Sequence, residues 1–121
     1  MSKLVASIKE AIEKCELRDG MTISFHHHMR NGDYVLNMVL DEIAKMGIKN
    51  LTVNASSIFD VHEPIIGHIK NGVVTGIECN YMGAKVGKAI SEGIMDKPVV
   101  FRSHGGRASD MEKGTSVIDV A

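Results

Sequence analysis

The sequence predicts an α/β fold with an open, mainly parallel sheet and flanking helices. Short runs rich in β-forming residues alternate with amphipathic helical runs, and a strand recurs about every 25 residues. The connecting segments are too long for hairpins, whereas a crossover helix between two strands brings those strands together in parallel. Each predicted element follows from its own pattern of apolar residues.

The first half of the chain predicts two helices and two strands. Apolar residues recur at three- and four-residue intervals near the N-terminus, with lysine and glutamate between them, which indicates an amphipathic helix. A polar stripe marks the second helix, which Asp33 or Asn31 can cap and Gly47 can end in a left-handed conformation. The predicted elements are a helix that includes Val5 to Cys15 and ends before Asp19-Gly20, a strand over residues 21–25, a helix from Asp33 to Gly47, and a strand within residues 51–57 that runs into the polar loop NASS.

The second half predicts two further helices and three strands. Pro64 suits the first turn of a short helix that the pair Asn71-Gly72 ends. The predicted elements are a helix over residues 64–71, a strand over 73–79, a helix over 83–93, a strand over 99–103 and a strand over 115–121. The last of these strands stops at the chain end without a polar tail. We therefore expect residues 1–121 to form a single α/β domain that is the N-terminal fragment of a longer chain.

The composition limits the classes of function. The chain has 14 basic and 15 acidic side chains, so its net charge is close to zero and binding to nucleic acid is not expected. Its two cysteines, Cys15 and Cys79, show neither a disulfide framework nor a zinc-binding spacing. No apolar run approaches the ~18 residues that span a bilayer. These features predict a cytoplasmic protein with reduced thiols and no membrane partner.

Candidate functional residues follow the predicted strands. Ligands of open parallel sheets bind outside the carboxyl ends of the strands, and the segments HHHMRNGD, NASS, NYMG and SHGGR all follow strands in this sequence. Adjacent histidine side chains diverge and cannot all reach one metal, so no metal site is expected. The candidates are His26, His27, Arg30, Asn31, Ser56, Ser57, Asn80, His104, Gly105, Gly106 and Arg107.

The segment SHGGR has two interpretations. Its glycines allow a close approach of the backbone to a ligand, and Arg107 can grip a carboxylate or phosphate through two hydrogen bonds. The alternative is a tight turn with an exposed arginine. Neither of the usual glycine-rich nucleotide-binding motifs is present. A crevice with two arginines and several imidazoles suits a polycarboxylate, or an acyl group whose oxygen develops negative charge.

From Asp19 onward the sequence resembles the citrate lyase alpha subunit family, the citrate CoA-transferase component. The segments SFHH, RNGD, NMV, ASS, HIKNGV and SHGGR carry this resemblance and are specific in combination. The resemblance implies a CoA-transferase-like domain of the kind also seen in ribose-5-phosphate isomerase. It also implies transfer of an acyl carrier protein or CoA thioester from acetyl to citrate, in a complex with the citrate lyase beta and gamma (acyl carrier) subunits.

The resemblance further implies roles for the candidate residues. The arginines would bind citrate carboxylates, the glycine N–H groups would donate to an oxyanion or carboxylate, and the histidines would orient substrate or shuttle a proton. The implied substrate-binding residues are Arg30, Asn31, Ser56, Ser57, Asn80, Gly105, Gly106 and Arg107, and the implied catalytic residues are His26, His27 and His104.

The implied enzyme binds no cofactor directly and acts on CoA or on the dephospho-CoA-type prosthetic group of an acyl carrier protein. We expect the 121-residue chain to be inactive by itself. A homo-oligomer is among the expected assemblies. An alternative function is that of a non-catalytic module that binds small carboxylates or docks another subunit.

Overall fold

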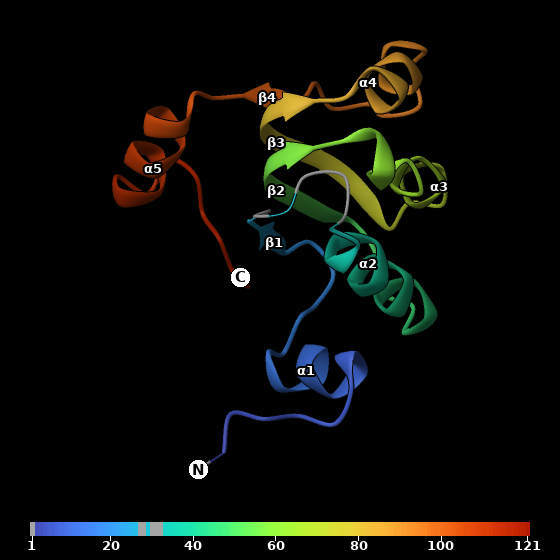
Figure 1. The fold of residues 1–121 in the computed structure, drawn as a ribbon, viewed down its shortest axis with the longest axis vertical. Coiled ribbons are helices and arrows are strands. Elements are labelled where there is room, and N and C mark those ends of the chain that lie inside the picture. Colours follow the sequence, from blue (N-terminus) through green and yellow to red (C-terminus); the bar gives the residue numbers. More distant parts are fainter. Residues whose placement is uncertain (1, 27–28, 30–32) are drawn as a thin grey trace.

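Within the described residues, four parallel strands form one sheet with the spatial order β1-β2-β3-β4 (Figure 1). The computed structural model describes residues 2–26, 29 and 33–121. Ser24 pairs with Asn54, and Asn54 pairs with Glu78, across the three longer strands. The strands are β1 (Thr22–Phe25), β2 (Leu51–Ile58), β3 (Val74–Met82) and β4 (Val100–Phe101). The predicted α/β class with an open parallel sheet is confirmed.

Helices lie on both sides of this sheet, with α2, α3 and α4 on one side and α5 on the other (Figure 1). Ser7 caps α1, because its hydroxyl accepts a hydrogen bond from the Glu10 N–H at 3.1 Å. Gly47 follows α2 with a φ of +76°, which confirms the predicted left-handed end of that helix. The helices are α1 (Ile8–Lys14), α2 (Val35–Lys45), the 3-10 helix η1 (Asp60–His62), α3 (Ile65–Lys70), α4 (Ala84–Ser91) and α5 (His104–Glu112). In the described part of the chain, no helix has the length and apolar character needed to cross a membrane.

The two faces of the sheet carry different kinds of side chain. Ile23, Val53 and Ile77 are register neighbours, and all three belong to the hydrophobic core together with buried residues of α2 and α3. Burial of such a side chain contributes about 1.5–3 kcal/mol. The next residue along each of these strands is polar. Since successive side chains of a strand point to opposite faces, these polar residues lie on the side where α5 is found.

The C-terminal third departs from the predicted elements. The segment SHGGR, predicted as a loop, begins α5, because Ser103 Oγ accepts a hydrogen bond from the Gly106 N–H at 3.0 Å and caps the first turn. Glycine disfavours a helix by roughly 1 kcal/mol relative to alanine, so the cap and the contacts of α5 with the sheet decide this helix. The predicted strand over 115–121 is wrong: in the described residues this segment makes only an isolated parallel bridge between Val120 and Ile23.

The predicted strand boundaries also need correction. β2 and β3 extend further than expected, so Ser56, Ser57 and Asn80 lie in strands rather than in loops. The predicted strand over 99–103 is reduced to the two residues of β4. β4 lies at the edge of the sheet, and the side chains of Val100 and Phe101 are 39% and 58% exposed. With so little burial, few apolar contacts support a longer pairing there.

Candidate functional site

Three polar side chains cross the face of the sheet beneath α5. We call Ser24, Asn54 and Glu78 the polar row, because they are register neighbours on β1, β2 and β3. Asn54 is 1% exposed, and Glu78 is half-buried. Buried amides and carboxylates are costly unless they form hydrogen bonds. In this structure their partners come from one another, from α5 and from the segments that flank α5.

Arg107 of α5 is held against the polar row by two hydrogen bonds. Its Nε donates to Asn54 Oδ1 at 2.9 Å, and its Nη2 donates to Ser24 Oγ at 2.9 Å. Burial lowers the pKa of the Arg107 guanidinium, and the negative charge of Glu78 opposes this effect. A guanidinium carries five N–H donors, so donors remain for a carboxylate or phosphate. Arg107 is half-buried, so the interpretation of SHGGR as a turn with an exposed arginine is wrong.

A second arginine joins α5 to the sheet through two carboxylates. Arg102, which follows β4, donates from Nε to the carboxylate of Asp110 on α5. Its Nη1 lies 3.3 Å from Glu78 Oε1. The hydrogen bond with Asp110 and the charge of Glu78 raise the pKa of Arg102. Arg102 is therefore engaged with acidic side chains of the chain itself, which leaves Arg107 as the better candidate for an external anion.

The predicted residues His104, Gly105 and Gly106 form the first turn of α5. The side chain of His104 is exposed, and Gly105 is exposed as well. A Cβ atom at position 106 would lie 2.9 Å from Ser103 Oγ, so the cap of α5 requires glycine at this position. The N–H groups of a helix N-terminus carry partial positive charge. The structure therefore puts the two glycines at a helix N-terminus one turn or less before Arg107.

Three other predicted residues lie towards the carboxyl ends of β2 and β3. Ser56 is 5% exposed and Ser57 is half-buried. The side chain of Asn80 donates from Nδ2 to the Arg102 carbonyl oxygen at 2.9 Å, and its Oδ1 is buried without a hydrogen-bond partner among the described residues. Ser56 and Asn80 each stand two residues beyond a member of the polar row. The alternation of side chains therefore places both on the same face as that row.

The segment after β1 contributes one described candidate. His26 follows β1, and its side chain is exposed. At the other end of this segment, Asp33 Oδ1 accepts a hydrogen bond from the Val35 N–H at 2.9 Å. The N-cap of α2 is Tyr34, one residue after the predicted Asp33. Three predicted residues lie outside the described part of the chain, namely His27, Arg30 and Asn31.

Buried His62 ties the start of α2 to η1. Its Nδ1 accepts a hydrogen bond from the Phe59 N–H at 2.9 Å, and its Nε2 lies 2.9 Å from the Asp33 carbonyl oxygen. Because Nδ1 is an acceptor, Nε2 carries the proton and donates to that carbonyl. His62 is 0% exposed, so its role is to fix the end of the segment between β1 and α2. This histidine is not among the candidates predicted from the sequence.

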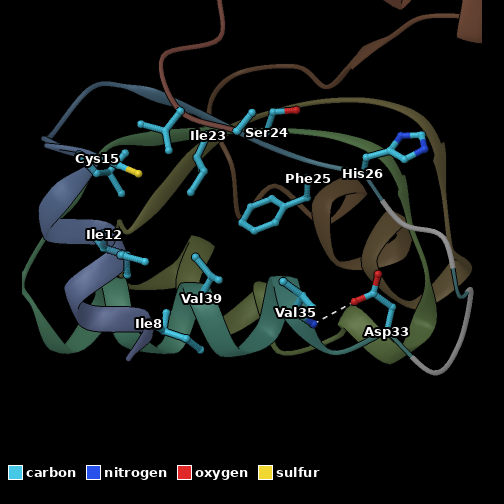
Figure 2. A pocket seen from close by; sticks show the side chains of 14 residues that line it. Ile8, Ile12, Cys15, Ile23, Ser24, Phe25, His26, Asp33, Val35 and Val39 are labelled. Atoms are coloured by element: carbon cyan, nitrogen blue, oxygen red, sulfur yellow. Dashed lines mark hydrogen bonds between the residues drawn. The ribbon is translucent and has the colours of Figure 1, made fainter. Parts of the chain in front are cut away.

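A cavity of about 380 Å³ lies beside the site, between α1, β1 and α2 (Figure 2). Its walls are mainly apolar, with Ile8 and Ile12 from α1 and Val39 from α2, whereas His26 and Asp33 lie towards one end (Figure 2). Ser24 lines this cavity and also accepts the hydrogen bond from Arg107 Nη2, so the cavity borders the Arg107 site.

The sequence interpretation missed the members of the polar row. The predicted candidates lie in segments expected to follow the strands, whereas Glu78 lies within β3. Asn54 begins the segment NASS but is not among the candidates, and it lies within β2. A signal was present, because polar residues recur at every second position, at Thr22 and Ser24, at Thr52, Asn54 and Ser56, and at Glu78 and Asn80. Among residues 2–26, 29 and 33–121, no group of three or more histidine, cysteine or acidic side chains is arranged to hold a metal ion. The polar row and Arg107 present hydroxyl, amide, carboxylate and guanidinium groups.

Comparisons with known proteins identify the family. The model of the citrate lyase alpha subunit (CitF) family matches residues 1–121. The citrate lyase alpha chains of Haemophilus influenzae and Escherichia coli are 50% and 49% identical to this chain over 119 residues. The matched region covers 98% of this chain, 24% of the Haemophilus influenzae protein and 23% of the Escherichia coli protein. This chain thus spans about a quarter of the length of these relatives. A solved structure of the alpha subunit of citrate lyase from Streptococcus mutans in complex with citrate is 64% identical, with a TM-score of 0.95, over 98% of this chain and 23% of that one. The chain therefore belongs to the citrate lyase alpha subunit family.

Proposed function

We propose that this chain supplies part of the citrate site of a citrate CoA-transferase. The enzyme would transfer the thioester of an acyl carrier protein or of CoA from acetyl to citrate, with citryl thioester and acetate as products. The observation that carries this proposal is the position of Arg107, held by Asn54 and Ser24 with donors left for a carboxylate. Membership of the family and the 64% identical relative, which was solved in complex with citrate, support it.

Arg107 would bind one carboxylate of citrate. A guanidinium that is already ordered loses less side-chain entropy on binding than a free arginine does. Partial burial also strengthens its attraction for an anion, because the surrounding dielectric is lower than that of water. The hydroxyl of Ser56 and the amide of Asn80, on the same face of the sheet, would complete the polar surface around the substrate.

The transfer needs two attacks on carbonyl carbon. A citrate carboxylate oxygen attacks the acetyl thioester carbonyl, the carbon–sulfur bond breaks, and a mixed anhydride and a thiolate result. The thiolate then attacks the citryl carbonyl of the anhydride, which forms citryl thioester and releases acetate. Each attack creates an oxyanion that fixed N–H donors would stabilise.

The N-terminus of α5 would provide such donors in this chain. Gly105 lies in its first turn, whereas the N–H of Gly106 already donates to Ser103 Oγ. His104 is exposed beside these groups, and His26 is exposed at the end of β1. Both imidazoles would orient substrate or move a proton, as we propose also for His27. Arg30 and Asn31 would bind substrate from the same segment as His27.

The partners of the reaction are also part of the proposal. The enzyme would bind no cofactor directly and would act on CoA or on the prosthetic arm of the acyl carrier (gamma) subunit. The beta subunit would receive the citryl thioester, and the complex would work in the cytoplasm. We expect no transfer from this chain without those subunits.

Arg107→Ala tests the proposal. In the complex assembled with the beta and gamma subunits, we expect transfer activity with citrate to fall about 100-fold or more, because the variant loses a charge-assisted contact with a carboxylate. The measurement is the rate of citryl thioester formation, together with calorimetric titration of citrate. The matched control is Arg18→Ala, which removes an exposed arginine from the segment between α1 and β1.

Three outcomes are distinct. Loss of citrate binding and of transfer in Arg107→Ala supports the proposal. Near-normal transfer in that variant refutes the assignment of Arg107 to citrate. Saturable citrate binding by a complex that forms no citryl thioester would instead favour the alternative of a non-catalytic carboxylate-binding module.

A further inference from the structure

Glu78 lies at the centre of the contacts that hold Arg107, although the hydrogen bonds of Arg107 itself go to Asn54 and Ser24. Its Oε2 accepts hydrogen bonds from Asn54 Nδ2 at 2.8 Å and from Ser116 Oγ at 3.0 Å. Its Oε1 faces Arg102 Nη1 at 3.3 Å. The carboxylate thus meets donors on both of its oxygens, from β2, from the segment before α5 and from the segment after it.

These contacts decide which way the amide of Asn54 points. Its Nδ2 donates to Glu78 and also lies 3.1 Å from Ser116 Oγ. The hydroxyl of Ser116 donates to Glu78, so it accepts from Asn54. With both N–H groups of the amide used in this way, the oxygen Oδ1 must point away from Glu78. That oxygen is the acceptor for Arg107 Nε.

The orientation of Asn54 in turn sets the orientation of Arg107. The guanidinium is planar and rigid, so a bond at Nε to Asn54 and a bond at Nη2 to Ser24 fix both its position and its plane. An amide turned the other way would present N–H groups to the guanidinium, which is itself only a donor. The negative charge of Glu78 also opposes the effect of burial on Arg107.

We propose that Glu78 is a positioning residue for citrate, because through Asn54 it orients the guanidinium of Arg107 towards the substrate carboxylate. The proposal rests on the proposed function, since it takes Arg107 as the citrate-binding group. Glu78 does not touch the substrate and takes no part in bond making. Its effect is on the affinity for citrate rather than on the acyl transfer steps.

The variant Glu78→Gln separates an effect of Glu78 on citrate affinity from an effect on the acyl transfer steps. Glutamine has the same shape, but only one of its two terminal atoms accepts hydrogen bonds. Either the amide nitrogen faces the donors of Asn54 and Ser116, or it faces the donor of Arg102. In both orientations a donor meets a donor, and the negative charge beside the two arginines is lost.

We expect Glu78→Gln to raise the KM for citrate about ten-fold in the assembled complex, the size of effect that follows from weakening one hydrogen bond to a charged group. The KM for acetyl thioester and kcat should stay within about two-fold of the parent values. The matched control is Glu63→Gln, which removes a surface charge that pairs with Lys85. Unfolding curves of all variants report whether the fold is retained.

The double variant Glu78→Gln with Arg107→Ala gives the decisive comparison. If Glu78 acts through Arg107, the double variant binds citrate no more weakly than Arg107→Ala alone. If the two losses multiply, or if Glu78→Gln behaves like Glu63→Gln, the positioning role is overturned while the citrate role of Arg107 stands. If Arg107→Ala alone leaves citrate binding unchanged, both the proposed function of Arg107 and the role of Glu78 fail.

A milder variant covers the case in which Glu78→Gln does not fold. Ser116→Ala removes one of the two donors to Glu78 Oε2 and the acceptor of an Asn54 N–H. We expect a smaller increase in the KM for citrate with kcat and the KM for acetyl thioester retained. An unchanged KM for citrate in a folded Ser116→Ala complex would overturn the proposal.

Discussion

The face of the sheet that packs on α2 and the face beneath α5 are built from adjacent residues of the same strands, yet they are held in different ways. On the first face, Val53 lies between Ile23 and Ile77, and its burial is favourable whichever apolar neighbour it meets. On the second face, Asn54 is just as buried, but each of its polar atoms must meet a partner of the right kind. The comparison shows that an apolar face needs only apolar residues at alternating positions, whereas a buried polar face needs a specific hydrogen-bond partner for each polar atom.

The largest effect on folding is expected when the character of the first face is reversed. Val53→Asn would lose the burial of an apolar side chain and place an amide among apolar neighbours. We expect a loss of about 3–5 kcal/mol in the free energy of unfolding, from the two costs together. Urea unfolding of the purified subunit measures it, with Val117→Asn, at a position 62% exposed, as the control. A loss no larger than that of the control would show that this face is not a dry core.

A smaller loss is expected when the second face is made apolar. Asn54→Leu leaves Glu78 and Arg107 each without one hydrogen bond, which we expect to cost about 1–3 kcal/mol. The same unfolding measurement applies, with the exposed Asn71→Leu as the control. If Asn54→Leu were as stable as the parent, the hydrogen bonds of the polar row would contribute nothing net to folding. The row would then serve only to orient Arg107.

The smallest expected effect concerns the chemical reactivity of the two cysteines rather than the stability of the fold. Cys79 lies on the same face as Ile77, and burial raises the pKa of its thiol to about 11, although a hydrogen bond with the Tyr81 backbone opposes this. At pH 8 only about one Cys79 side chain in a thousand would be a thiolate. We expect iodoacetamide to modify the exposed Cys15 well before the buried Cys79, as followed by mass spectrometry of peptides. Equal rates in the folded subunit would contradict the burial of Cys79, and denaturant provides the control in which both react.

The same thiol predicts a direction for pH dependence. Because the folded pKa of Cys79 lies above its ordinary value of 9.0, the contribution of the protonated thiol to stability is fully present below pH 9.0. It is lost as the pH rises through about 11. A Cys79→Ala variant should lack this part of the alkaline decline. An identical decline in the variant would assign it to other groups.

The strands and helices with clear periodicity were predicted well, whereas the contacts that surround Arg107 were not. The apolar residues of α2 and of β1 to β3 recur at the spacing of their element, so the sequence indicated both type and order. α5 was missed, because two glycines in its first turn oppose a helix and the capping of Gly106 by Ser103 is a matter of geometry. The strand predicted over 115–121 was wrong, because this segment pairs with the edge strand β1 at one bridge only. Ser116, in the same segment, is instead buried beside Glu78 and Asn54.

The sequence by itself determined the α/β class and the parallel pairing of the strands, because both depend on patterns that neighbouring residues form along the chain. Only the tertiary structure decided that Arg107 rests on Asn54 and Ser24, which stand 53 and 83 positions away in the sequence. It also decided that Glu78 faces two arginines rather than solvent. The physical reason is that apolar burial depends on how many neighbours a side chain has, whereas a hydrogen bond depends on which atom lies opposite. That second property appears only when the strands and α5 have been brought together.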